Sequence, residues 1–182
     1  AFSRDSQALT VWGYDLTTFA TSDWHIIRRL KGASSYFDGK YYRRRPDAWD
    51  NQLLLHDMAY VPGTHTLVFG GAKFAKGTGL CEPTPAPYDP FAGLLWVLKP
   101  EDAALNHPIV VYCYPHGGEV GLIAVDPDGQ KVATVTGPNQ VKPGVYDTKE
   151  NNTKIISLLS GRSITPPLAW HSDNGIGGLV YT

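Results

Sequence analysis

The sequence predicts a mainly β fold, an antiparallel β-sandwich or barrel of about nine to eleven short strands with one or two short helices. The clearest support is segment 109–136, where three apolar runs rich in β-branched residues are separated by two turns that contain Gly and Pro. The 19 Gly and 14 Pro are spread along the chain, which indicates many turns between short elements. A hydrophobic content of 42% with 18% charged residues is typical of a globular chain, so a single domain over 1–182 is expected.

The first elements expected along the chain are a strand over 7–13 and a short helix over 23–31. In the first segment, QALTVWG, apolar side chains recur at every second residue, as on one face of a strand. In the second segment, Trp24, Ile27 and Leu30 recur at helical spacing, with capping residues before them and a glycine after them.

Two hairpins are predicted next. The Asp-Gly pair at 38–39 lies between two aromatic runs, and such a pair favours the tight turn of a hairpin because Gly adopts positive φ and Asp tolerates it. The second hairpin pairs 52–60 with 65–70, and the Pro-Gly pair at 62–63 suits the centre of a type II turn.

The second half of the chain opens with segment 81–90, which carries four prolines in ten residues. Proline cannot donate to a ladder, so this segment is expected to be a surface crossing within the one domain. The Asp-Pro-Asp-Gly sequence at 126–129 is expected to be a hairpin turn rather than a calcium loop. The other expected elements are strands over 94–98, 109–114, 120–125, 131–136 and 178–181, a helical turn at 100–105, and 154–159 as either a strand or a helix.

Positive charge is concentrated in one window of the chain. Residues 24–45 hold seven Lys or Arg and one Asp, a net charge of +6, whereas the remaining residues have a net charge of −7. The same window holds five aromatic residues. Guanidinium groups bind phosphate and carboxylate in a bidentate manner, and aromatic rings stack on bases or sugars. This window is therefore the predicted surface for an anionic ligand.

The residues expected to bind the ligand are Arg28, Arg29, Tyr41, Tyr42, Arg43, Arg44 and Arg45. Two histidines flank the window, and imidazole titrates near neutral pH, so His25 and His56 are the candidates for general acid and base. Alternation along a strand places Arg43 and Arg44 on opposite faces, so the alternative of core aromatics beside solvent-exposed arginines stays open.

The two cysteines, Cys81 and Cys113, are consistent with one disulfide or with two buried thiols. A disulfide would close a loop of about 32 residues and would favour a secreted or extracytoplasmic location. Because the chain begins at Ala1 and its only methionine is Met58, we expect that a signal peptide was removed or that the sequence is part of a longer protein.

No motif in the sequence indicates a metal or a cofactor, and none is expected. CxxC pairs, histidine pairs at helical spacing, phosphate-binding glycine loops and nucleophile elbows are all missing from the sequence. No apolar run approaches the roughly 20 residues that cross a bilayer. The expected partner is an anionic small molecule or polymer, with nucleic acid as one possibility and the oligomeric state left open. The function predicted is anionic-ligand binding, with metal-independent hydrolysis by histidine as an extension; the alternative is a non-catalytic carbohydrate-binding or adhesion module.

Overall fold

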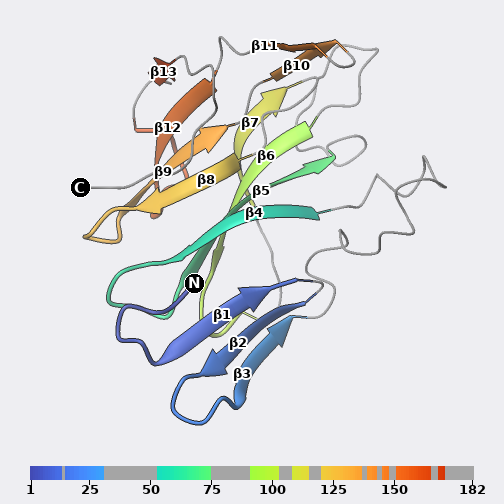
Figure 1. Cartoon of the computed structure of the whole chain (residues 1–182). Coiled ribbons are helices and arrows are strands. Elements are labelled where there is room, and N and C mark those ends of the chain that lie inside the picture. The colour runs from blue at the N-terminus through green and yellow to red at the C-terminus, as the bar shows by residue number, and fades with distance from the viewer. Residues whose placement is uncertain are drawn as a thin grey trace, which may run out of the picture.

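The fold is built from antiparallel strands (Figure 1). The computed structural model describes residues 1–13, 15–30, 53–74, 91–102, 108–114, 120–136, 139–142, 145–147, 151–164 and 168–170. Its strands are β1 (Ala8–Trp12), β2 (Leu16–Ala20), β3 (Ile26–Leu30), β4 (Leu53–Tyr60), β5 (Leu67–Phe74), β6 (Phe91–Leu98), β7 (Ile109–Tyr114), β8 (Val120–Val125), β9 (Lys131–Thr136), β10 (Asn139–Lys142), β11 (Val145–Asp147), β12 (Asn151–Ser157) and β13 (Leu168–Trp170).

The strands form layered sheets rather than one closed barrel within the described residues. The central sheet has the order β4-β5-β6-β7, the N-terminal sheet has the order β1-β2-β3, and the C-terminal sheet has the order β13-β12-β9-β8. Strands β10 and β11 form a separate two-stranded ribbon. Side chains alternate along β5, so Leu67 and Phe69 belong to the core under the N-terminal sheet while Val68 belongs to the core under the C-terminal sheet. The central sheet is therefore covered on both faces.

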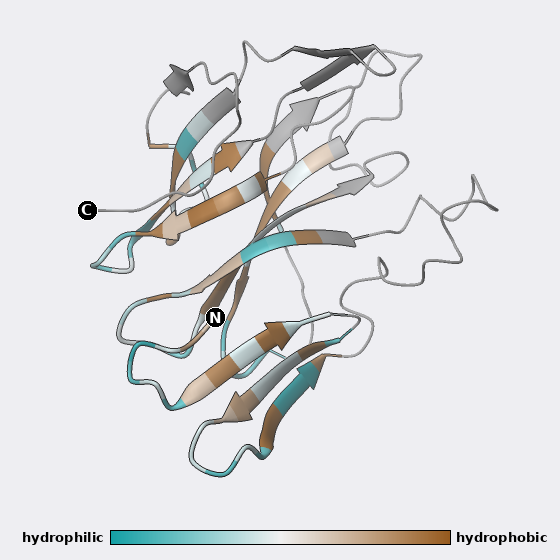
Figure 2. Ribbon diagram, in the orientation of Figure 1, coloured by the Kyte–Doolittle hydropathy of each residue, from teal (hydrophilic) through white to brown (hydrophobic). Residues whose placement is uncertain are grey.

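The core between the central and C-terminal sheets is made of small and β-branched residues. Its members are Val61, Val68, Leu95, Val111, Val120, Ile123, Val132 and Ile156. At Gly70 a Cβ atom would lie 2.7 Å from Val120 Cγ1 and 2.9 Å from Ile123 Cγ2. Glycine is thus required at this position because β8 crosses the central sheet without room for a methyl group. Figure 2 shows β8 as apolar along most of its length, as expected of a strand that packs this closely.

The core between the central and N-terminal sheets contains larger side chains. Its members are Ala8, Leu16, Leu30, Leu55, Tyr60, Leu67, Phe69, Ala92, Leu94, Trp96 and Leu98. Along β1 the buried residues alternate with more exposed ones, because its other face points away from the core. These two sheets also enclose a cavity.

Two polar contacts join the C-terminal sheet to the central sheet. Asp57, at a bulge in β4, accepts a hydrogen bond of 2.9 Å from the backbone N of Ile123. Lys154 Nζ, on β12, donates to the backbone O of Val111 at 2.5 Å, and burial lowers the pKa of this amine. These contacts satisfy polar groups that would otherwise be left between two apolar faces.

Most of the predicted strands are confirmed. The expected strand over 7–13 is β1, and the strand over 94–98 lies within β6. The segment 154–159, for which a strand or a helix was expected, is a strand up to Ser157, where β12 ends. The second hairpin is confirmed as β4 and β5, with Gly63 at a φ of 72° in its turn.

The hairpin turn at 126–129 is also confirmed. The Asp126 carboxylate accepts hydrogen bonds from the backbone N of Gln130 at 2.7 Å and of Lys131 at 2.8 Å. The backbone N of Gly129 donates to the backbone O of Asp126 at 2.9 Å. The carboxylate is therefore used to close the turn.

The helix expected over 23–31 is wrong, because this segment contains the strand β3. Thr18 pairs with Arg28 and Phe19 pairs with Ile26, so Ile27 is an extra residue in a β-bulge. A bulge shifts the alternation by one residue, and the resulting spacing of three between Ile27 and Leu30 resembles a helical period.

The meander expected over 109–136 is correct in its strand boundaries and in the antiparallel pairing of β8 with β9, but wrong in the pairing of β7 with β8. Strand β7 pairs with β6 in the central sheet, whereas β8 pairs with β9 in the C-terminal sheet. Apolar runs of this kind do not specify their neighbour by pattern alone, and so the sequence could not place β7 and β8 in different sheets.

Several predictions lie outside the described residues. These are the hairpin around 38–39, the proline-rich crossing at 81–90, the end of the helical turn at 100–105 and the strand at 178–181. Cys81 also lies outside them, and the side chain of Cys113 is not described, so the disulfide stays a prediction. No helix in the described ranges is long and apolar enough to span a membrane.

Candidate ligand-binding cavity

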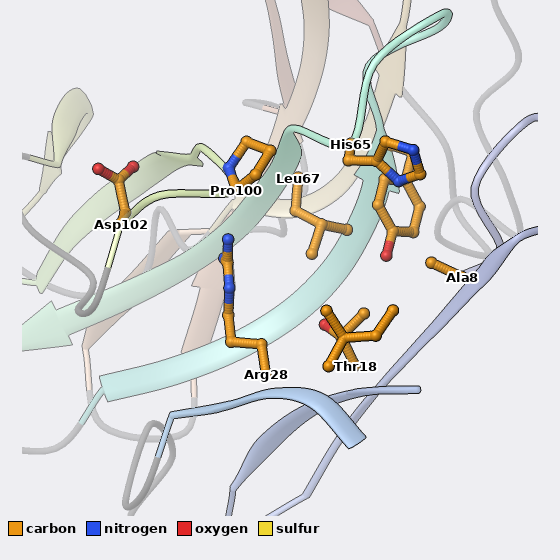
Figure 3. A pocket seen from close by; sticks show the side chains of 9 residues that line it. Ala8, Thr18, Arg28, His65, Leu67, Pro100 and Asp102 are labelled. Atoms are coloured by element: carbon orange, nitrogen blue, oxygen red, sulfur yellow. The ribbon is translucent and has the colours of Figure 1, made fainter. Parts of the chain in front are cut away.

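A cavity of about 460 Å³ lies between the N-terminal sheet and the central sheet (Figure 3). Its walls come from β1, β2, β3, the ends of β4 and β5 that meet at their turn, and the turn that follows β6. The lining residues are Ala8, Thr18, Ile27, Arg28, Tyr60, His65, Leu67, Pro100 and Asp102. Most of this surface is apolar, and a few polar groups face it from different strands.

The bulge in β3 explains why two successive residues line the cavity. Regular alternation would send the side chains of Ile27 and Arg28 to opposite faces of the N-terminal sheet. Because Ile27 is the extra residue of the bulge, both side chains reach the cavity. The bulge therefore places the apolar side chain of Ile27 next to the guanidinium group of Arg28.

Among the described residues, a hydrogen bond to the turn after β6 holds the Arg28 guanidinium at the cavity. Its Nη2 donates to the backbone O of Lys99 at 2.6 Å. The turn is closed by Asp102, whose Oδ2 accepts from the backbone N of Lys99 at 2.7 Å and whose backbone N donates to the Lys99 O at 3.1 Å. In the part of the chain that the structure describes, Arg28 makes no ion pair with a carboxylate, so its charge is not neutralised by a direct partner.

Three hydroxyl groups form a chain beside the cavity. Tyr60 Oη lies 2.7 Å from Thr10 Oγ1, which lies 2.8 Å from Thr18 Oγ1. Three hydroxyl hydrogens are available for two bonds. Thr10 is fully buried, so it is expected to donate its own hydrogen along the chain rather than keep it without an acceptor, and the third hydrogen then remains at one end of the chain. Tyr60 and Thr18 are the two ends, and both line the cavity. The chain therefore offers a ligand one O–H donor.

His65 is held by the N-terminal segment. Its Nε2 lies 3.4 Å from Asp5 Oδ2. Asp5 Oδ1 accepts from Ser3 Oγ at 2.6 Å and from the backbone N of Gln7 at 3.1 Å. The hydrogen bond from Ser3, then that from Gln7, lowers the pKa of Asp5, with a smaller contribution from the charge of His65. Asp5 is therefore a carboxylate at neutral pH and fixes the imidazole at the cavity wall.

The predicted ligand residues Arg28 and Arg29 point to different faces of the N-terminal sheet. Arg28 lines the cavity, whereas Arg29 Nε pairs with Asp15 Oδ2 at 2.6 Å on the other face. Their separation follows from strand alternation. The other predicted ligand residues, Tyr41, Tyr42, Arg43, Arg44 and Arg45, lie outside the described residues.

The two predicted catalytic histidines do not line this cavity. His25 lies in the turn before β3, where its Nδ1 is 2.6 Å from Asp23 Oδ1 and both side chains are exposed. The same histidine lowers the pKa of Asp23 through its side-chain and backbone hydrogen bonds. His56 lies on β4 with an exposed side chain. Their acid–base role stays a prediction.

Sequence reasoning did not single out the residues that meet Arg28 at the cavity. Tyr60 and His65 come from the β4–β5 hairpin and Asp102 from the turn after β6, and only the packing of two sheets brings these residues to Arg28. The Pro-Gly turn at 62–63 gave the one local signal, since a hairpin there places Tyr60 and His65 close to each other. Among the described residues, no group of three His, Cys, Asp or Glu side chains is arranged to hold a metal ion.

Comparisons with known proteins give no family. No family model matches the chain, and no curated protein matches it. One solved structure with a similar arrangement is "Kuenenia stuttgartiensis Hydrazine Synthase", with a TM-score of 0.41 and 10% sequence identity. The match covers 93% of this chain and 48% of that chain, so this chain spans less than half of its length.

Proposed function

We propose that this protein binds a small molecule with an anionic head group and an apolar body in the cavity between its N-terminal and central sheets. The observation that carries the proposal is the Arg28 guanidinium at this cavity, without a carboxylate partner among the described residues. A guanidinium in such a place binds a carboxylate or phosphate with several donors at once.

The size and lining of the cavity support a small ligand. Ligand pockets commonly enclose about 300–1,000 Å³ and are mostly apolar, with a few convergent polar groups. This cavity measures about 460 Å³, and Ile27, Leu67 and Pro100 give it apolar walls. The hydroxyl chain that ends at Tyr60 and Thr18 adds one donor for the head group. A compact acid suits these walls better than the polymer considered from the charge of window 24–45.

The proposal is tested by calorimetric titration of the whole chain with octanoate, phenylacetate and phenyl phosphate. Octanol serves as the neutral match for octanoate. We expect at least one of the acids to bind and octanol to bind more weakly, because the guanidinium distinguishes charge. Arg28→Gln is expected to weaken binding by about ten-fold or more, since a hydrogen bond to a charged group contributes about 1.5–3 kcal/mol.

The chain provides a matched control in Arg29→Gln. Arg29 is the next residue on the same strand but points to the opposite face, where it pairs with Asp15. Its substitution is expected to leave binding unchanged. Absence of binding by the native protein, or equal loss in the Arg29 and Arg28 variants, would contradict the proposal.

A second candidate function, glycan binding or adhesion, is favoured by the outward face of the N-terminal sheet. Cross-strand pairing places four apolar residues in one row on this face: Phe2, Leu9, Phe19 and Ile26. Phe2 is 60% exposed and Ile26 is 50% exposed. Trp24 precedes this row with 59% of its surface exposed and a φ of 61°, a conformation that costs a non-glycine residue free energy. An exposed aromatic ring is a stacking platform for sugars.

A glycan array separates the two candidate functions. If the second is correct, a neutral glycan binds, its binding does not change with salt, and Trp24→Ala abolishes it while Arg28→Gln does not. Loss of glycan binding in the Arg28 variant, or binding that falls steeply with salt, would instead favour the cavity.

A further inference from the structure

A second cavity of about 260 Å³ shares His65 with the first cavity. It is lined by Arg4, Asp5, Gly63, Thr64 and His65. Apart from Gly63, its lining residues are polar or charged, but in both cavities most of the exposed lining surface is apolar. The same imidazole therefore forms part of the wall of both spaces.

The size of the second cavity indicates that it serves as an extension of the first. Its volume lies below the range of about 300–1,000 Å³ that is common for separate ligand sites. His65 belongs to both walls, so the two cavities lie next to each other at this side chain. The His65 ring is half exposed and is held by Asp5 rather than buried in a core.

Each cavity contains one arginine. No carboxylate of the described ranges forms an ion pair with Arg4 or with Arg28. Asp5 lines the second cavity beside Arg4, but its carboxylate already accepts hydrogen bonds from Ser3 and Gln7 and contacts His65. Arg4 is thus the donor in the second cavity with capacity for an anion.

We infer that the two cavities together bind one elongated dianion, with one acidic group at Arg28, an apolar middle against Ile27 and Leu67, and a second acidic group at Arg4. This inference rests on the proposed function and narrows its ligand class. The acidic groups can be carboxylates or phosphates, because a guanidinium binds both. Arg4 therefore determines selectivity for a dianion over a monoanion.

The test compares dicarboxylates with monocarboxylates of equal chain length by calorimetric titration of the whole chain. The pairs are adipate with hexanoate, suberate with octanoate and sebacate with decanoate. We expect one of the dicarboxylates to bind about ten-fold more tightly than its matched monocarboxylate, from one added charged hydrogen bond. Arg4→Gln is expected to remove this advantage and to leave monocarboxylate affinity unchanged, while Arg4→Lys retains part of it.

The possible failures are distinguishable. If each dicarboxylate binds no more tightly than its monocarboxylate, or if Arg4→Gln leaves the advantage intact, the inference is wrong and the proposed function stands. If no acid of either kind binds the native protein, the proposed function fails and the inference fails with it. Because Arg4 is exposed at the surface, its substitution is not expected to affect folding, and a thermal unfolding curve checks this.

Discussion

The two faces of the central sheet are packed in opposite ways. On the face toward the C-terminal sheet, Gly70 lets Val120 and Ile123 approach so closely that no methyl group fits between them. On the face toward the N-terminal sheet, Tyr60 joins a chain of hydroxyl groups, and a cavity of about 460 Å³ remains next to Arg28. One sheet thus provides a tightly packed face and a face with space for a ligand.

The difference shows how a β-sandwich of this size separates stability from binding. Small and β-branched side chains interdigitate at high density, and this packing is the largest source of stability available to a sheet. Polar groups and a cavity weaken a layer, and here they lie on the face whose core is built from larger side chains.

Gly70→Ala should cause the largest loss of stability. Its new Cβ would meet Val120 Cγ1 at 2.7 Å, Ile123 Cγ2 at 2.9 Å and the backbone O of Val120 at 3.1 Å, and the backbone atom cannot rotate away. Overpacking of this kind costs about 1–3 kcal/mol of the free energy of unfolding, measured by urea denaturation.

The control for this variant is Gly121→Ala. Gly121 lies on β8, and a Cβ there would meet only the backbone O of Val135 at 3.8 Å, an ordinary contact. The substitution should be neutral or slightly stabilising, because alanine restricts the unfolded chain. Equal losses at the two glycines would contradict the close packing assigned to this face.

Tyr60→Phe should cause a smaller loss on the cavity face. The substitution removes the hydroxyl that lies 2.7 Å from Thr10 Oγ1 but leaves the contact between Thr10 and Thr18 in place. One hydrogen bond contributes about 0.5–1.5 kcal/mol, and urea denaturation should show a loss of this size. A loss as large as that of Gly70→Ala would mean that the two faces do not differ as described.

Lys154→Met should change the pH dependence of stability on the packed face. Burial lowers the pKa of Lys154 in the folded protein below its usual 10.5. At neutral pH the amine is protonated in both states, so its desolvation cost is fully present; as the pH rises through the folded pKa toward 10.5, the folded state releases its proton first and the cost disappears. The stability of the variant relative to the native protein should therefore fall over this alkaline range. A difference that stays constant up to the unfolded pKa would contradict the desolvation of this amine.

Local sequence pattern explains much of the strand content but little of the layering. Runs such as 109–114 and 120–125 were correct in their boundaries, because β-branched residues and flanking turns define a strand locally. Their placement in two different sheets depends on which partner each strand meets in the folded chain, and no local pattern encodes that choice. The bulge at Ile27 is likewise not encoded by a local pattern, and the residue spacing that it produces in β3 led to the wrong prediction of a helix.

The site was predicted only in part. Charge concentration identified Arg28, and a guanidinium at the cavity agrees with that chemistry, but the same pattern could not separate it from Arg29 on the other face. His65 and Asp102 carry no local signal for a ligand site. They meet Arg28 only because two sheets pack with a space between them. No local sequence pattern predicts such a space.

The most direct test of the ligand cavity is the affinity of an acid for Ala8→Leu. Ala8 is 2% exposed and lines the cavity from β1 without contributing a polar group, so a larger side chain should fill the space and leave Arg28 in place. We predict that this variant keeps or gains stability and binds the acid at least about ten-fold more weakly than the native protein. A folded Ala8→Leu protein that binds the acid with native affinity would contradict this prediction.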